Sequence, residues 1–175
     1  MKGGRTMGTM ILISGKACWG KTSLIKSLAA KIPMSDVSCM NSLGEKINKP
    51  EDCDGDILCT GKVLFVDGKE KSVGLSSGGD YAKYIIDALN ALTHNHEKEL
   101  DVFVSACRPR GETIVEAVNL AKRYGYEVIV TSNYHGVDLF SSDDYYAMGC
   151  KSVLSSGLDL NDACVDAMVE LIKKV

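Results

Sequence analysis

A short stretch near the amino end constrains this chain more than any other feature. Residues 15–22 read Gly-Lys-Ala-Cys-Trp-Gly-Lys-Thr, which matches the pattern G-x-x-x-x-G-K-[ST]. The pattern has structural meaning only between a strand and a helix. Residues 9–13 form a short apolar run that is typical of a buried strand. Downstream, apolar residues recur at helical spacing until Pro33 stops the pattern, and they are Leu24, Ile25, Leu28, Ala29 and Ile32.

The chemistry of this stretch is that of a polyphosphate site. Glycines let the backbone wrap around phosphates because no Cβ collides or forbids the dihedral angles. Loop N–H groups and the start of the next helix supply partial positive charge. We expect Lys21 to reach the β- and γ-phosphates and the Thr22 hydroxyl to hold magnesium. The predicted nucleotide-binding residues are Gly15, Lys16, Ala17, Cys18, Trp19, Gly20, Lys21, Thr22 and Ser23. Trp19 either packs over the nucleotide or fills a gap against a neighbouring loop.

Composition sets the class of protein. A chain of 175 residues, 45% hydrophobic and 25% charged, fits one domain over residues 1–175. A net charge of −3 argues against a molecule that binds nucleic acid by overall charge, although a local basic patch stays open. No apolar run approaches the roughly 20 residues of a membrane span, and residues 1–6 lack the apolar core of a signal peptide. The seven cysteines form no Cys-x-x-Cys pair, so we expect free thiols and a cytoplasmic protein.

Residues 34–61 show no clear periodicity, and we expect most of this stretch to be irregular, with a short strand at 57–59. It either covers a substrate site or serves as a plain connection. Asp52-x-Asp54-x-Asp56 resembles the start of a calcium loop, but glycine is at the fourth loop position and Val63 is at the twelfth. We therefore reject a calcium site.

Two aspartates compete for the role of the acid that orients magnesium. Asp67 ends the apolar run 62–66, but Asp67-Gly68 between two β-like runs predicts a hairpin turn. Asp80 follows a second β-like run and two glycines, just before a predicted helix at residues 82–92. Open α/β sheets bind ligands at such strand-to-helix crossings, although Asp80 also suits a helix N-cap. We favour the turn for Asp67 and the functional role for Asp80.

Arginines follow the next buried strand, which is predicted at residues 101–107. Arg108 and Arg110 offer planar, permanently charged donors that suit phosphate, although both could be solvated. A capping box at Thr113-x-x-Glu116 predicts the start of the next helix. Further strands are predicted at residues 127–131 and 151–154, with a final helix whose inner face comprises Val165, Met168, Val169 and Ile172. Asn133, Tyr134 and His135 are weaker candidates for contact with the nucleotide base.

The motif and the order of strands and helices resemble the P-loop NTPase superfamily, and the small size resembles its kinase branch. Specific sequence similarity covers residues 9–32. The runs after the inner strands are also similar to small phage-type kinases that act on nucleotides or on 5-hydroxymethyluracil in DNA. The resemblance implies a three-layer α/β fold with a mostly parallel central sheet, a β-hairpin and helices on both faces.

The same resemblance implies an ATP- and Mg²⁺-dependent phosphotransferase. Lys21, Asp80, Arg108 and Arg110 would be its catalytic residues, with Thr22 and Asp80 at the metal. The acceptor would be a nucleoside, a nucleotide or a hydroxymethylated base in DNA. An arginine-rich lid of the usual nucleotide-kinase type is missing from the sequence. An NTP hydrolase acting as a conformational switch and a nucleotide-binding module without catalysis stay open as alternatives.

Overall fold

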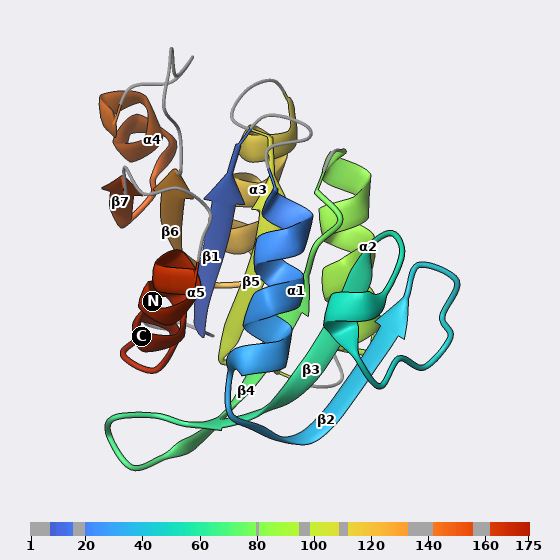
Figure 1. The fold of residues 1–175 in the computed structure, drawn as a ribbon. Helices are drawn as coiled ribbons and strands as arrows, with labels where there is room; N and C mark the ends of the chain where they lie inside the picture. Colours follow the sequence, from blue (N-terminus) through green and yellow to red (C-terminus); the bar gives the residue numbers. More distant parts are fainter. Residues whose placement is uncertain are drawn as a thin grey trace.

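Strands and helices alternate along the part of the chain that the computed structural model describes, namely residues 8–15, 20–79, 81–94, 99–108, 112–132, 142–155 and 162–175 (Figure 1). Within these ranges the strands belong to one seven-stranded sheet in the order β2-β3-β4-β5-β1-β6-β7. Neighbours from β4 to β7 pair in parallel, whereas β2 and β3 add on antiparallel beside β4. The strands are β1 (Gly8–Ser14), β2 (Met34–Asn41), β3 (Ile57–Leu64), β4 (Glu70–Ser76), β5 (Val102–Cys107), β6 (Tyr126–Ser132) and β7 (Ser152–Ser155).

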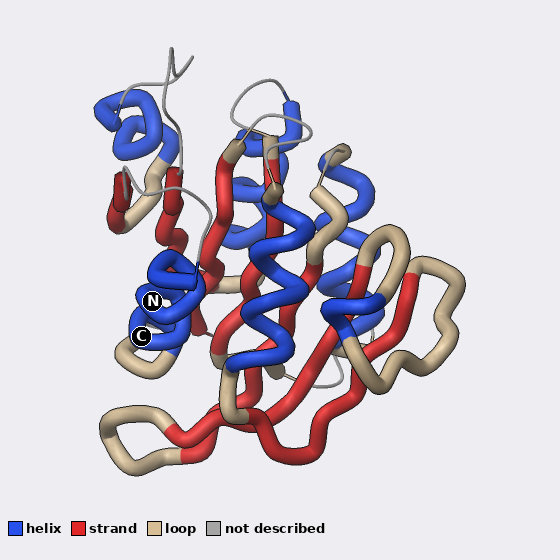
Figure 2. Tube along the Cα trace, in the orientation of Figure 1, coloured by secondary structure: helices blue, strands red, loops and turns tan. Residues whose placement is uncertain are grey.

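Helices cover both faces of the sheet (Figures 1 and 2). On one face, α1 and α5 pack over a core that includes Ile11, Leu28 and Met168. On the other face, α2 and α3 pack over a core that includes Phe103 and Leu89, to which α4 contributes Tyr145. The helices are α1 (Lys21–Lys31), α2 (Ala82–Leu92), α3 (Glu112–Arg123), α4 (Ser142–Met148) and α5 (Asp162–Ile172), with a short 3₁₀ turn η1 (Pro50–Asp52). The expected α/β class, with a mostly parallel sheet between helices, is confirmed.

The central strands form because their residues are buried on both faces. Every residue of β5 is buried, and so are the last six of the seven residues of β1. In register, Ile11 of β1 lies between Val104 of β5 and Ile129 of β6. Continuous apolar runs of this kind are what parallel strands under two helical layers require. The strands predicted at residues 9–13 and 101–107 are therefore found close to their expected positions, and so is the helix predicted after the motif.

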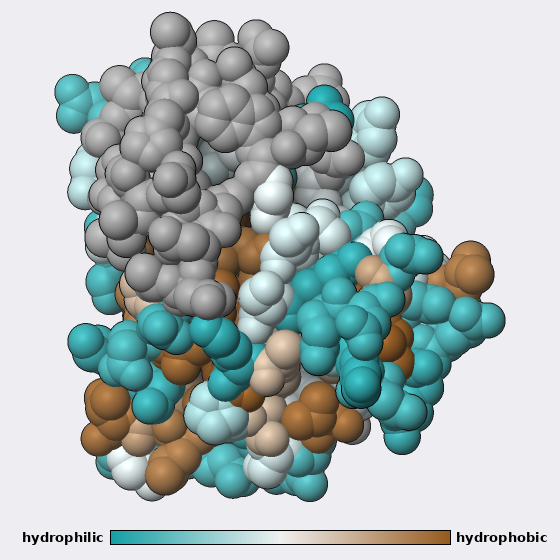
Figure 3. Space-filling view, in the orientation of Figure 1, coloured by the Kyte–Doolittle hydropathy of each residue, from teal (hydrophilic) through white to brown (hydrophobic). Residues whose placement is uncertain are grey.

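The segment 34–61 corrects the sequence prediction. Residues 34–41 form the edge strand β2, and the predicted short strand at 57–59 is the beginning of the longer strand β3. Four consecutive residues of β2 are exposed, so the strand lacks the alternation by which an edge strand is recognised in a sequence. In Figure 3, hydrophilic groups gather over the surface around η1, which agrees with the polar composition of this segment.

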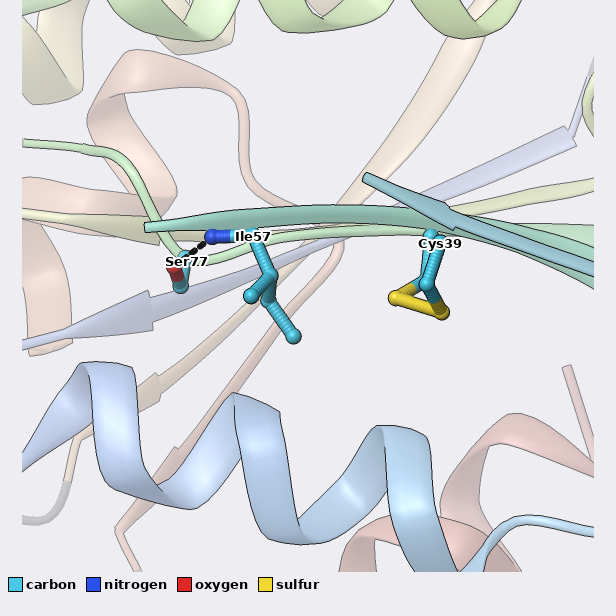
Figure 4. The surroundings of a disulfide bond; sticks show 4 residues. Cys39, Ile57 and Ser77 are labelled. Atoms are coloured by element: carbon cyan, nitrogen blue, oxygen red, sulfur yellow. Dashed lines mark hydrogen bonds between the residues drawn. A yellow bond between two sulfur atoms is a disulfide. The ribbon is translucent and has the colours of Figure 1, made fainter. Parts of the chain in front are cut away.

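The cysteine prediction is wrong for two residues. Cys39 of β2 and Cys59 of β3 lie directly opposite each other and form a disulfide. Both are almost fully buried, and the bridge lies between the sheet and α1 (Figure 4). The remaining cysteines in the described residues, Cys53, Cys107, Cys150 and Cys164, are free thiols. Cross-strand neighbours in register can be far apart in sequence, so the spacing of the cysteines did not reveal the pair.

Two smaller predictions also change. Helix α3 begins at Glu112, so Thr113 lies inside its first turn and does not cap it as the capping box predicted. Gly125 ends this helix with a positive φ of 76°, as expected. Helix α4 was not predicted, because its residues 142–148 are mostly polar.

Candidate functional site

The motif residues join the central strand to α1 at the carboxyl edge of the sheet. Gly15 directly follows β1, and its N–H donates to the Cys107 carbonyl at the end of β5 (3.2 Å). Gly20 is the N-cap of α1 and has φ 78°, a left-handed conformation that glycine adopts without penalty. Its carbonyl accepts the Leu24 N–H (2.9 Å), which starts the helical hydrogen bonds. Lys16, Ala17, Cys18 and Trp19 lie outside the described residues.

Lys21 is turned into the protein. Its side chain is only 8% exposed, and its ammonium group donates to the carbonyl of Gly15. A Cβ on Gly15 would lie 3.3 Å from the Lys21 Cδ, so this glycine leaves space for the lysine chain. The positive charge is therefore held against the first residue of the motif.

The sheet topology makes the carboxyl ends of the central strands a candidate binding site. The chain runs from β4 to β5 on one side of β1, then crosses to β6 on the other side. In open α/β sheets, ligands bind outside the carboxyl ends of the strands where the strand order reverses in this way. Gly15 and α1 lie at this point. The Thr131 hydroxyl, near the end of β6, is buried and has no hydrogen-bond partner within the described part of the chain.

An aspartate that the sequence reading missed lies beside the start of α1. The Asp56 carboxylate accepts a hydrogen bond from the Thr22 hydroxyl (3.4 Å) and a shorter one from the Ser77 hydroxyl (2.9 Å) through the same oxygen. Ser77 also accepts the Ile57 N–H (2.9 Å) and donates its own N–H to the Ile57 carbonyl (3.1 Å), as Figure 4 shows in part. The start of β3 and the end of β4 therefore position Asp56 at the motif.

A cavity adjoins Asp56 on the α2 side of the sheet. Its volume is about 460 Å³, within the range of small-molecule sites. Strands β3 and β4 and helix α2 supply most of its lining, with Ser42 from the turn after β2. The lining residues are Ser42, Asp56, Ile57, Leu58, Ser76, Gly78, Tyr84, Asp87, Ala88 and Ala91.

Arg108 lies at the same edge, immediately after β5. Its guanidinium carbon is 6.0 Å from the centre of the Tyr81 ring. Tyr81 meets Tyr84 edge to face, with ring centres 5.4 Å apart. Because Tyr84 lines the cavity, this chain of contacts connects Arg108 to the cavity wall. Arg110, the second predicted arginine, lies outside the described residues.

The two candidate aspartates have different outcomes. Asp67 lies in the β3–β4 turn, where it accepts the Lys69 N–H (2.9 Å), so the predicted turn is confirmed. This backbone hydrogen bond, with smaller help from Lys71, lowers the pKa of the exposed Asp67 carboxyl. Strand β4 begins after this turn and runs in the same direction as β1. Asp67 therefore lies near the amino-terminal ends of the parallel strands, whereas Gly15 lies at their carboxyl ends (Figure 1). Asp80 lies outside the described residues.

A thiol lies behind the motif but is unsuited to nucleophilic chemistry. Complete burial raises the pKa of Cys107 to about 12, although Lys21 and a hydrogen bond from Ser14 act to lower it. Only a thiolate is a strong nucleophile. Cys107 therefore packs as a neutral side chain beneath the site.

Comparisons with known proteins give no match for this chain, whether to a family model, to a curated protein or to a solved structure. Within the described residues there is no cluster of three or more histidine, cysteine, aspartate or glutamate side chains that could hold a metal ion. The helices in those residues are also too short or too polar to cross a membrane. The functional argument therefore depends on the site itself.

Proposed function

We propose that the protein is an ATP- and Mg²⁺-dependent phosphotransferase with a P-loop kinase fold. One observation carries the proposal: the Gly-Lys-Thr end of the motif starts a helix at the reversal point of a parallel sheet, with a carboxylate and a cavity beside it. Phosphoryl transfer asks a protein mainly for positioning and neutralisation of charge, and this arrangement offers both.

Lys21 and the N–H groups at the start of α1 would hold the phosphates. In the structure the Lys21 ammonium is bonded to the Gly15 carbonyl, from which it would turn toward phosphate oxygens. The burial of Lys21 strengthens such a contact, since less water screens the charge.

The residues beside Thr22 fit a magnesium ion. A hydroxyl and a carboxylate oxygen 3.4 Å apart are hard oxygen donors of the kind magnesium prefers. Magnesium in such sites uses one or two protein oxygens together with substrate phosphates, so a larger acidic cluster is not needed. When bound, the ion would neutralise the developing charge on the phosphates. Thr22 would be one ligand, and Asp56 or the predicted Asp80 would be the carboxylate that orients the ion.

The cavity supports transfer to an acceptor over simple hydrolysis. A hydrolase needs space for one water molecule, whereas the cavity of about 460 Å³ has room for a drug-sized molecule. Arg108 would stabilise the transferring phosphoryl group from the end of β5, with Arg110 as the second predicted arginine. A nucleoside, a nucleotide or a hydroxymethylated base in DNA would be the acceptor.

The test follows the label from ATP carrying a radioactive γ-phosphate. The protein is incubated with this ATP, Mg²⁺ and a panel of nucleosides, nucleotides and DNA containing 5-hydroxymethyluracil. Transfer to one class of acceptor is expected. Full ATP occupancy by calorimetry without transfer to any acceptor would overturn the kinase assignment, and release of phosphate at the same rate with and without acceptors would favour the hydrolase.

A further inference from the structure

The lining of the cavity beside Asp56 carries information about the acceptor. We propose that this cavity takes a nucleoside without a phosphate group, whose free hydroxyl donates a hydrogen bond to Asp56. The inference rests on the proposed phosphotransferase function and selects one acceptor class from it.

The Asp56 end of the cavity is the reactive end. Asp56 lines the cavity and also contacts Thr22, the second residue of α1 and the neighbour of Lys21. A hydroxyl bonded to Asp56 is therefore next to the place where the γ-phosphate would lie. In the transfer, the hydroxyl oxygen forms a bond to the γ-phosphorus of ATP while the bond from that phosphorus to the β,γ-bridging oxygen breaks. ADP leaves with the bonding electron pair, and the hydroxyl proton goes to the Asp56 carboxylate and then to water, which leaves the predicted Asp80 as the carboxylate that would orient the ion.

The body of the cavity suits a flat, mostly apolar ring. Ile57, Leu58, Ala88 and Ala91 supply apolar surface, and the Tyr84 ring borders the same space. Tyr84 is braced by its edge-to-face contact with Tyr81. Aromatic side chains stack on nucleobases without regard to their identity, because every base has a π-face. Ser42 and Ser76 add hydroxyl groups that can bond to the polar edge of a base or a sugar.

The charge of the described lining disfavours a phosphate. It includes the carboxylates of Asp56 and Asp87 and neither lysine nor arginine. Lys83 pairs with Asp87 on the surface of α2, whereas Asp56 accepts its hydrogen bonds from the hydroxyls of Thr22 and Ser77. A monophosphate placed here would face the Asp56 charge, with no lysine or arginine in the described lining to offset it. A neutral nucleoside avoids this repulsion.

Direct binding without ATP tests the inference separately from the proposed function. Adenosine, guanosine, cytidine, thymidine and deoxyuridine, and the 5′-monophosphate of each, are titrated into the full-length protein by calorimetry. At least one nucleoside should bind, and its monophosphate should bind at least about tenfold more weakly, because the phosphate and the Asp56 carboxylate carry like charges. Failure of all nucleosides to bind, or equal or tighter binding of a monophosphate, would overturn the inference. Tighter binding of an oligonucleotide containing 5-hydroxymethyluracil would overturn it as well.

Matched variants locate the binding. Tyr84→Ala should weaken nucleoside binding about tenfold, which is the loss expected for one stacking contact. The control is Tyr146→Ala, since Tyr146 is 50% exposed and Tyr84 is 49% exposed, but only Tyr84 lines the cavity. Equal losses in the two variants would contradict the assignment.

A second pair tests the reactive end through the kinetics of phosphate transfer. Asp56→Asn should lower kcat more than it raises KM, whereas Asp54→Asn, two residues away and outside the cavity, should leave both unchanged. An unchanged kcat in Asp56→Asn would overturn the role of Asp56. Transfer of label to a monophosphate would refute this inference while leaving the kinase function intact, whereas absence of ATP binding would refute the kinase function itself.

Discussion

The centre of the sheet and its antiparallel edge contribute to the site in different ways. Strands β1 and β5 are buried along almost their whole length, and they hold Gly15 and Lys21 between two helical layers. Strand β2 is exposed over half of its residues and is joined to β3 by a disulfide. The centre holds the motif residues of the proposed phosphate site, whereas the edge provides Asp56 and much of the cavity wall. If the proposal holds, the binding of phosphate and the choice of acceptor depend on regions held by different forces.

The largest expected effect comes from the centre. Replacing Lys21 with alanine removes the buried ammonium beside Gly15, and ATP turnover should fall about 100-fold or more, as when one oxyanion donor is lost from an active site. The measurement is steady-state phosphate transfer, with calorimetry for ATP binding. Since the edge is untouched, nucleoside binding to the cavity should persist.

Lys31→Ala is the control for this change. Lys31 ends the same helix, is 42% exposed and pairs with Asp166 at 3.7 Å. Its loss should leave transfer within about twofold, because exposed ion pairs contribute little. Similar losses in the two variants would mean that α1 responds to any loss of charge, and that Lys21 has no special role.

The next effect, on stability, is expected where the segment after β4 passes the end of β5. A Cβ on Gly79 would lie 1.8 Å from the Ala106 carbonyl oxygen, so Gly79→Ala forces the backbone after β4 away from the end of β5. The free energy of unfolding should fall by about 3 kcal/mol, the upper range for overpacking. At Gly78 the nearest atom is the Asp56 Oδ2 at 3.4 Å, so Gly78→Ala should change stability by less than about 1 kcal/mol. Chemical denaturation measures both, and equal midpoints would show that the close approach at Gly79 is relieved at little cost.

The sequence was informative where local pattern and burial agree. The motif fixed the place of α1, and continuous apolar runs predicted β1 and β5 because both faces of those strands are covered. Asp67-Gly68 between two β-like runs predicted the hairpin. Each of these features depends on residues that are neighbours in the chain.

The edge could not be predicted in this way, because its determinants are long-range. Asp56 meets Thr22 across 34 residues and Ser77 across 21, and no periodicity reports such a contact. Its position just before the predicted strand at 57–59 was the available signal. The Cys39–Cys59 disulfide is likewise long-range: the two cysteines are 20 residues apart in the sequence and meet because of the register in which β2 pairs with β3.

The disulfide provides a third test of the difference between the edge of the sheet and its centre. Closing a loop of this length should contribute about 3 kcal/mol to stability by restricting the unfolded chain. We expect reduction by a phosphine to lower the free energy of unfolding by about that amount, and amide exchange to rise first in β2 and last in β1 and β5. Peptide mapping of the unreduced protein checks the link itself. Cys53→Ala is the control, since Cys53 is a free thiol, and its exchange pattern should match that of the wild type.

The smallest effect concerns a single proton behind the motif. Burial raises the pKa of Cys107 from 9.0 to about 12, so between these values the unfolded chain releases a proton that the folded chain retains. Unfolding is then favoured as the pH rises: the stability is fully present below pH 9 and is lost as the pH approaches 12. By pH 10, one unit above the pKa of the unfolded thiol, the loss should be about 1.4 kcal/mol, since each such unit corresponds to about 1.4 kcal/mol.

Cys107→Ala isolates this proton. The variant loses packing equally at every pH, so the informative quantity is the change in stability between pH 8 and pH 10, measured by denaturation for both proteins. The wild type should lose about 1.4 kcal/mol more than the variant over this interval. Equal losses would mean that the Cys107 thiol reaches solvent, and the centre would then be as open as the edge. A sealed thiol instead means that water is excluded directly beneath Gly15 and Lys21, which is the condition under which the lysine charge acts most strongly on a phosphate.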